Sequence, residues 1–143
     1  RSEKSIAKAV AKLTYAFANA NVPKVNVITG EAYGSAYVTM NSKALGADVT
    51  YAWPDASIGM MDANEAAKIM YADDIAKSAD VQSVISEKAA EYAALQSGVE
   101  SAAARGYVDT IISPADTRKY VIGAFEMLFT KREERPSKKH GTV

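Results

Sequence analysis

The sequence predicts one α/β domain made of short strands and longer helices. Segments with helical hydrophobic periodicity alternate along the chain with short runs of β-branched residues, and no internal repeat, low-complexity stretch or linker interrupts them. The composition, with 48% hydrophobic and 24% charged residues, is that of an ordinary globular protein. We therefore expect residues 1–143 to form a single domain with its own core.

The first half of the chain begins with an amphipathic helix. Its apolar residues recur at spacings of four, three and four, which predicts one buried face and an end within residues 19–23. They are Ile6, Val10, Leu13 and Phe17. The pattern then predicts a strand at 24–29 (KVNVIT), a helix at 36–45, a second strand at 48–52 and, after a break at Trp53-Pro54, a short apolar piece at 57–60. We expect Trp53 and the Met60-Met61 pair to pack in the core.

The second half is expected to contain more helix. The pattern predicts helices at 63–71, 81–96 and 99–105, then a strand at 107–112 and a last helix that starts at Ser113-Pro114. Asp80 is the expected N-cap of the long helix, and Gly106 the expected C-cap of the short one. The last helix should bury an apolar face made of Val121, Ile122, Phe125, Leu128 and Phe129. Residues 131–143 form a charged tail that we expect to be exposed.

Charge and composition exclude several classes of partner. Seventeen basic residues balance seventeen acidic ones, which argues against nucleic acid. No apolar run approaches the roughly 18–20 residues that span a bilayer, so we expect no membrane insertion. The absence of cysteine excludes a disulfide framework and fits a cytoplasmic protein. Because the sequence starts at Arg1 and is amphipathic almost at once, we expect it to be part of a longer polypeptide.

The usual side-chain catalysts are missing from the sequence. The only histidine, His140, lies in the charged tail, and no serine sits in a G-x-S-x-G context, which argues against a nucleophilic hydrolase. Most acidic residues stand at helix starts or at exposed helical positions, where capping and solvation explain them. We expect no metal site.

One segment could supply chemistry through its backbone. Residues 29–37 (TGEAYGSAY) place small residues between the end of a strand and the start of a helix. Amide groups at a helix N-terminus can stabilise an oxyanion, and small side chains leave room for it. The same pattern also suits tight packing of a strand on a helix, and from these residues alone both interpretations stay open.

Several blocks in a fixed order resemble a known family over nearly the whole chain. They are VPKV at 22–25, VIT at 27–29, AYG at 32–34 with AY at 36–37, LGAD at 45–48, AWP at 52–54, ARGYVD at 104–109, ISPADTR at 112–118, and KRE at 131–133 with KKHG at 138–141. This order resembles the C-terminal half of the carboxyltransferase subunit of biotin-dependent acyl-CoA carboxylases and decarboxylases. That family includes the propionyl-CoA carboxylase β subunit, the transcarboxylase large subunit and the methylmalonyl-CoA decarboxylase α subunit.

The resemblance implies a crotonase-like (ClpP/crotonase) fold, with a short-stranded sheet surrounded by helices. It implies carboxyl transfer between carboxybiotin, held by a biotin carrier protein, and a short-chain acyl-CoA of the propionyl-CoA or methylmalonyl-CoA type. The N-terminal half of the subunit would bind most of the acyl-CoA. The backbone amides of Ser35 and Ala36 would form the oxyanion hole on the biotin side, and Tyr33, Gly34, Tyr37 and Val38 would contact substrate. The implied assembly is a homo-oligomer, with dimers of C-terminal halves and a hexamer of full subunits.

The chain departs from the family pattern at three places. One is residues 61–65 (MDANE), including Asp62, which replace a stretch that usually contains glycine in the family, so we expect a neighbouring loop to differ. Ser35 stands where the family commonly has a second glycine, and it adds a hydroxyl beside the implied oxyanion hole. Val38 stands where propionyl-CoA carboxylases commonly have an aspartate that faces the acyl pocket. The residues therefore leave open which acyl-CoA is used.

Two other functions remain as alternatives. One is a biotin-independent crotonase-type acyl-CoA hydratase or isomerase, which would need a positioned carboxylate at the acyl pocket. The other is a module that only oligomerises when isolated, because half of the implied active site would lie on another chain segment.

Overall fold

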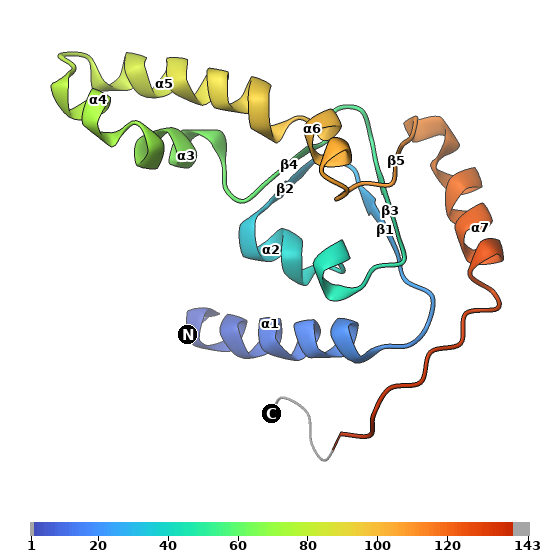
Figure 1. Ribbon diagram of the computed structural model, residues 1–143. Coiled ribbons are helices and arrows are strands. Elements are labelled where there is room, and N and C mark those ends of the chain that lie inside the picture. Colours follow the sequence, from blue (N-terminus) through green and yellow to red (C-terminus); the bar gives the residue numbers. More distant parts are fainter. Residues whose placement is uncertain (1, 139–143) are drawn as a thin grey trace.

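The computed structural model describes the backbone of residues 2–138 and the side chains of residues 5–138. Two small parallel sheets form its centre (Figure 1). The larger sheet has the strand order β1-β3-β5, with β1 at Val25–Ile28, β3 at Val49–Ala52 and β5 at Thr110–Ile111. The smaller sheet pairs β2, Glu31–Tyr33, with β4, Ser57–Gly59. All three strand pairs are parallel, so helices and loops must carry the chain back between them.

Seven α-helices surround these sheets within the described residues. They are α1 (Ser2–Asn19), α2 (Gly34–Thr39), α3 (Ala63–Met70), α4 (Ala72–Lys77), α5 (Val81–Tyr92), α6 (Val99–Ala104) and α7 (Thr117–Met127). Short 3-10 turns lie at Lys43–Leu45 and Pro114–Asp116, and α5 continues into a π-helical segment, Ala93–Ser97. Helices α3, α4 and α5 form a hairpin that projects away from the sheets, whereas α1 lies below α2 (Figure 1).

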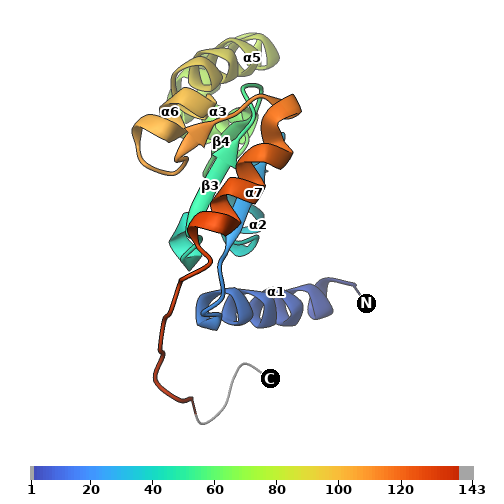
Figure 2. The same ribbon diagram turned by 90° about the vertical axis from the view of Figure 1, so that its right-hand side faces the viewer.

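The central strand β3 separates two clusters of buried side chains. All four of its residues are buried, as expected of a parallel strand covered on both faces. Val49 and Tyr51 form one cluster with Ile112 and Ala124. Helix α7, which carries Ala124, lies beside β3 (Figure 2). The other cluster, on the side of α2 and α6, contains Ile28, Ala52, Ala56, Ile58, Val99, Ala102 and Val108. The α/β prediction is therefore confirmed.

Most predicted elements exist, but one predicted helix has different bounds and two elements were not predicted. The helix expected at 36–45 begins at Gly34 and ends at Thr39, because Asn41 adopts a left-handed φ of 57° and the chain then turns through a 3-10 helix. The three-residue strand β2 and the helix α4 were missed. Asp80 does cap α5, since its carboxylate accepts a hydrogen bond from the amide of Ser83 at 3.2 Å.

Two predicted buried faces are covered only in part. Phe17, Val121 and Leu128 are half-buried, and Leu128 packs against the α7-side cluster, but the other members of both faces are exposed. Ile6 in α1 is 56% exposed, and Phe129 beyond the end of α7 is 79% exposed; Ile122 and Phe125 are also exposed. Met60, expected in the core, is exposed as well. Hydrophobic periodicity identifies an apolar face, but it does not say that the same chain covers that face. Trp53 does pack against the α7-side cluster, and its indole Nε1 donates to Thr117 Oγ1 at 2.9 Å.

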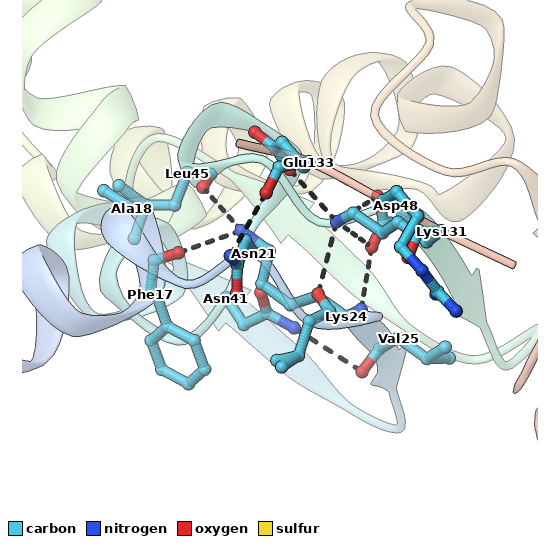
Figure 3. Close-up of polar contacts among 12 residues, drawn as sticks. Phe17, Ala18, Asn21, Lys24, Val25, Asn41, Leu45, Asp48, Lys131 and Glu133 are labelled. Carbon is cyan, nitrogen blue, oxygen red and sulfur yellow. Dashed lines mark hydrogen bonds and ion pairs between the residues drawn. The ribbon is translucent and has the colours of Figure 1, made fainter. Parts of the chain in front are cut away.

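The first residue of the tail, Lys131, is fixed to the rest of the domain. The expectation that the whole tail is exposed was therefore wrong at this residue. Lys131 Nζ contacts both carboxylate oxygens of Asp48 at 2.9 Å and also donates to the carbonyl of Val22 (Figure 3). The side chains of Lys131 and Asp48 are only 13% and 20% exposed. Asp48 also accepts a hydrogen bond from the amide of Lys24 at 2.7 Å. The predicted residues 139–143, including His140, lie outside the described part of the chain.

The same region holds the C-terminal end of α1. The buried Lys24 donates through Nζ to the carbonyl of Phe17 at 2.9 Å (Figure 3). Arg135 donates to the carbonyl of Ala18. Both carbonyls belong to the last turn of the helix, where intrahelical donors run out. Cations from outside the helix therefore cap α1 and complement its dipole.

We predict that Lys131→Gln lowers the free energy of unfolding by about 2 kcal/mol, because Asp48 then loses a charged hydrogen-bond partner in a mostly buried position. Urea denaturation of the chain measures this change. Lys77→Gln is the matched control: Lys77 is exposed at the end of α4 and should change stability by less than about 0.5 kcal/mol.

The loss of stability in the Lys131→Gln variant should depend on pH. Burial acts to raise the pKa of Asp48, but hydrogen bonds from Lys131 and from the amide of Lys24 outweigh it and hold that pKa below its usual value. The stability that the ionised Asp48 carboxylate contributes is present above about pH 3.9 and is lost as the pH falls through the lowered pKa of Asp48. The hydrogen bond to Asp48 raises the pKa of Lys131, so its contribution persists to about pH 10.4 and is lost above. A difference between wild type and variant that stays constant from pH 2 to 7 would contradict this assignment.

Candidate functional site

The turn from β2 into α2 places the residues Ser35 and Ala36 at the surface. Strand β2 ends at Tyr33, which has an extended conformation, and Gly34 then starts the helix with a left-handed φ of 60°. Ser35 and Ala36 follow in the first helical turn, and both are exposed. Amides in a first turn lack intrahelical acceptors, so those of Ser35 and Ala36 can donate to a bound group.

Gly34 makes this turn possible for two reasons. A left-handed φ is disfavoured for residues that have a Cβ atom. In addition, a Cβ atom at this position would lie 3.1 Å from the backbone carbonyl oxygen of Met60, which follows β4. The glycine therefore allows α2 to start close against the smaller sheet.

The local charge suits a developing anion. No acidic residue lies in the first turn of α2 itself, so the positive end of the helix is not neutralised from within the helix. Glu31 lies three residues before this turn on β2, where it is exposed to solvent. The side chains of Ser35 and Ala36 are small, so they leave the first turn accessible.

A groove of about 410 Å³ lies beside this turn. Its walls come from the end of β1, from β2 and from one side of α2. The lining residues are Asn26, Val27, Ile28, Thr29, Gly30, Glu31, Ala32, Tyr33, Ala36, Tyr37 and Met40. The groove therefore brings Tyr33, Ala36 and Tyr37 together, three of the residues predicted from the sequence.

A second, smaller pocket of about 240 Å³ lies on the other side of Tyr37. Its lining residues are Tyr37, Val38, Ser42, Ala44, Ile58, Gly59, Met60, Gln96, Ala102, Arg105 and Tyr107. The walls are mostly apolar, and no aspartate or glutamate is among them. Val38 thus faces a different space from Ala36, although the two residues are only two positions apart.

Tyr37 separates the groove from the pocket. Its side chain packs against the core cluster on the α2 side, and its hydroxyl oxygen is buried without a hydrogen-bond partner among the described residues. Burial raises the pKa of Tyr37, and the nearby Tyr107 raises it further. A neutral, buried hydroxyl without a partner is a group that a ligand could satisfy.

The structure thus gathers the predicted residues in one place without testing their roles. Tyr33, Ala36 and Tyr37 line the groove, Tyr37 and Val38 line the pocket, and Gly34 and Ser35 form the turn without lining either space. The oxyanion and substrate roles remain predictions. The sequence analysis missed Gln96, Arg105 and Tyr107 as pocket residues. The one signal in the sequence was Gly106, and the structure shows that its φ of 83° turns the chain between Arg105 and Tyr107.

Two further features bear on the possible chemistry. Among the residues that the structure describes, His, Cys, Asp and Glu side chains nowhere gather in groups that could hold a metal ion. None of the helices within residues 2–138 is long and apolar enough to cross a membrane.

Comparison with known proteins identifies the family. The family model for the carboxyl transferase domain matches residues 1–143. The chain belongs to the carboxyl transferase family. Among solved structures, the carboxyl transferase transcarboxylase 12S, with methylmalonyl-coenzyme A and methylmalonic acid bound, matches 96% of this chain with a TM-score of 0.89 at 43% sequence identity. The chain therefore has the crotonase-like fold of these carboxyl transferases, as the resemblance implied.

Curated carboxyl transferases give the same result at higher identity. The putative propionyl-CoA carboxylase β chain of Bacillus subtilis is 53% identical over 133 residues, which cover 93% of this chain and 26% of that protein. The methylmalonyl-CoA decarboxylase α subunit of Propionigenium modestum is 45% identical, again over 93% of this chain and 26% of the relative. The chain thus spans about a quarter of the length of the carboxyl transferases that it matches.

We predict that Gly34→Ala destabilises the chain by about 2 kcal/mol, because alanine disfavours the left-handed φ and its Cβ would crowd the Met60 carbonyl. Chemical denaturation measures the loss. Gly123→Ala is the matched control: Gly123 lies inside α7 with open space around it, so alanine should stabilise the chain by about 0.5–1 kcal/mol. Equal effects of the two substitutions would show that the turn imposes no special constraint.

Proposed function

We propose that this chain is a domain of the C-terminal half of a biotin-dependent acyl-CoA carboxyltransferase and that it forms the biotin side of the active site. The reaction is carboxyl transfer between carboxybiotin and a short-chain acyl-CoA of the propionyl-CoA or methylmalonyl-CoA type. The observation that carries this proposal is the position of Ser35 and Ala36, two exposed residues in the first turn of α2, of which Ala36 lines the groove, in a carboxyl transferase. Because the relatives are about four times as long, we propose that the N-terminal half of the same subunit supplies the remaining residues.

The residues at the turn fit a biotin ureide. Carboxybiotin, when bound, would supply the carboxyl group that the acyl-CoA accepts, and the ureide oxygen of biotin would then carry negative charge. The amides of Ser35 and Ala36 can donate to this oxygen, and preorganised donors of this kind contribute about 3 kcal/mol each to a transition state. Tyr33 and Tyr37 provide aromatic walls for the groove beside these amides. No side-chain acid is needed for this role.

The pocket beside Val38 favours this reaction over a hydratase or isomerase. Such enzymes need a carboxylate positioned at the acyl group, and the lining of this pocket contains none. Glu31 does line the neighbouring groove, but it is exposed to solvent. The family match also favours carboxyl transfer.

The proposed partners follow from the same assignment. A biotin carrier protein would deliver carboxybiotin to the groove, and full subunits would assemble as a homo-oligomer, with C-terminal halves in dimers and whole subunits in a hexamer. The related transcarboxylase 12S structure describes a hexamer assembly with methylmalonyl-coenzyme A bound. Exposed apolar residues on α1 and α7 offer surfaces for contacts between subunits. Separately, we infer a cytoplasmic location from the absence of cysteine.

The first test reconstitutes the active site. We would combine this chain with the part of the Bacillus subtilis relative that precedes the matched region, and measure carboxyl transfer from methylmalonyl-CoA to free biotin. Activity should require both pieces. Ala36→Leu should lower kcat by at least about 100-fold, because the larger side chain blocks access to the amides.

Ala76→Leu is the control for this substitution, because Ala76 is an exposed helical alanine in α4, far along the chain from the turn. It should leave transfer unchanged. A folded complex that ignores biotin, or one in which Ala36→Leu transfers as fast as Ala76→Leu, would overturn the proposal.

A second test concerns the acyl group. We predict that Val38→Asp shifts the relative kcat/KM values for acetyl-, propionyl- and butyryl-CoA, because it places a carboxylate in a pocket that is otherwise mostly apolar. The reconstituted complex provides the measurement, and Val38→Ala keeps the pocket apolar as a control. Unchanged ratios in Val38→Asp would exclude this pocket as a determinant of acyl-chain choice.

A further inference from the structure

We propose that a hollow beside α7 binds a phosphorylated nucleoside. Helix α7 lies beside β3 on one face of the larger sheet (Figure 2). The hollow has a volume of about 760 Å³ and is bounded by α7, by the turn before it and by Tyr51 of β3. None of its lining residues belongs to the groove or to the pocket described above. The site is therefore separate from the one proposed for carboxyl transfer.

Gly123 leaves open space in the middle of this hollow. Several lining residues recur at intervals of three and four, so they form one face of the helical segment. They are Ala115, Arg118, Lys119, Ile122, Gly123 and Glu126. A Cβ atom at Gly123 would meet no atom within 4 Å, so packing does not require glycine there. The volume of the hollow lies within the range of roughly 300–1,000 Å³ that is typical of small-molecule sites.

Tyr51 presents a hydroxyl that no described protein group satisfies. The residue is only 7% exposed, yet it lines the hollow, and its ring packs edge to face on Tyr120. The hydroxyl makes no hydrogen bond within residues 5–138. Burial raises the pKa of Tyr51, and Asp109 and Tyr120 raise it further, so the hydroxyl stays protonated. Asp109 is already bound to the amide of Thr50 and to Lys43, at 2.8 and 2.7 Å, so the Tyr51 hydroxyl remains available to a ligand.

Two cations lie at one end of the hollow, in the first turn of α7. Arg118 and Lys119 are exposed, and neither makes an ion pair or a hydrogen bond within the part of the chain that the structure describes. Asp116 precedes this turn but does not line the hollow. The start of the helix is fixed, because Trp53 Nε1 donates to Thr117 Oγ1 at 2.9 Å. A guanidinium and an ammonium on one helical turn suit the oxygens of a phosphate group.

Glu126 determines the direction of the ligand. It follows Arg118 after about two helical turns, which is about 12 Å along the axis of α7. A carboxylate repels phosphate, but it accepts hydrogen bonds from ribose hydroxyls or from the amino group of a base. We therefore expect the phosphate to lie at Arg118 and the nucleoside to extend toward Glu126.

The remaining walls suit a planar base. Tyr120 offers an aromatic surface, and the exposed side chains of Ile122 and Met127 are apolar. Bases pack well on aromatic and apolar side chains. A phosphorylated nucleoside combines a charged end, a planar body and polar groups at the far end. Free nucleotides and the nucleotide end of CoA share this chemistry.

Isothermal titration calorimetry of this chain with ADP tests the proposal. ADP should bind at one site per chain, whereas adenosine and inorganic pyrophosphate should each bind at least about 10-fold more weakly, because each lacks one of the recognised parts. CoA that competes with ADP at similar affinity would identify the nucleotide end of CoA as the ligand, and ADP binding without CoA binding would identify a free nucleotide. No binding of ADP at about 1 mM, or pyrophosphate that binds as tightly as ADP, would overturn the proposal.

Gly123→Leu tests the location of the site. The added side chain enters the open space in the middle of the hollow, so the chain should fold and the affinity for ADP should fall at least about 10-fold. Gly123→Ala is the matched control, since it removes the same glycine but fills much less of the space. Unchanged ADP affinity in a folded Gly123→Leu variant would place the nucleotide elsewhere and contradict the assignment.

Two side-chain substitutions test the polar contacts. Lys119→Gln should weaken ADP binding about 10-fold, whereas Lys77→Gln, the same change at an exposed lysine of α4, should leave it unaltered. Tyr51→Phe keeps the ring and should weaken binding about 5-fold through loss of the hydroxyl. Equal affinities in the two lysine variants would exclude a phosphate at this end. If Gly123→Leu does not fold, the lysine pair still decides.

A second copy of the chain is the competing occupant. If sedimentation shows dimers that Gly123→Leu dissociates, while ADP does not bind, the face is a self-interface and the proposal fails. Phe125 and Phe129 are exposed but do not line the hollow, so subunit contacts through them leave it open. None of these measurements uses carboxyl transfer. Loss of the proposed activity would therefore leave the nucleotide site intact, and a failure to bind ADP would leave the activity assay to stand by itself.

Discussion

The carboxylate of Asp48 joins three parts of the chain that lie far apart in the sequence. It accepts hydrogen bonds from the amide of Lys24 before β1 and from the ammonium of Lys131 after α7, while Asp48 itself leads into β3. Lys24 in turn reaches the last turn of α1 and the carbonyl of Leu45. The carboxylate of Asp48 therefore fixes the start of β1 and the start of β3. Through Lys24 it also fixes the end of α1 and the 3-10 turn at Lys43–Leu45.

The candidate site lies at the opposite ends of the strands. The groove begins where β1 finishes and continues along β2 to the first turn of α2. The amino ends of β1 and β3 are held by the contacts of Lys24 and Asp48. The carboxyl ends of β1 and β2 present backbone groups that a ligand can approach. This separation resembles other α/β folds, in which ligands bind beyond the carboxyl ends of parallel strands.

Much of the fold was predictable because its signals are local. The strands at Val25–Ile28 and Val49–Ala52 follow from β-branched runs, and the cap at Asp80 follows from the preference of aspartate for that position. Strand β2 was missed because three residues between two glycines carry no periodicity. The small residues within 29–37, and then the resemblance, indicated a turn from a strand into a helix there. The structure adds the reason for glycine at position 34, because a Cβ atom would lie 3.1 Å from the carbonyl oxygen of Met60.

Contacts between distant segments could not be predicted in this way. Nothing in the charged run at residues 131–135 indicates that Lys131 is half-buried against Asp48 while its neighbour Arg132 is exposed. Gln96, Arg105 and Tyr107 come together at one pocket only because α5, α6 and the turn at Gly106 have particular directions. The apolar faces of α1 and α7 were recognised correctly as apolar, but their exposure depends on which other chains are present.

The π-helical segment Ala93–Ser97 should make the chain sensitive to insertions and deletions at the base of the α3–α5 hairpin. A π turn holds one residue more than an α turn, so removal of one residue here would let α5 continue regularly and rotate Gln96 by about 100° away from the pocket. Insertions or deletions in the projecting hairpin of α3, α4 and α5 would meet no such phase requirement at their outer end (Figure 1). Natural variation in length among carboxyl transferases of this kind should therefore collect at the tip of the hairpin and avoid its base.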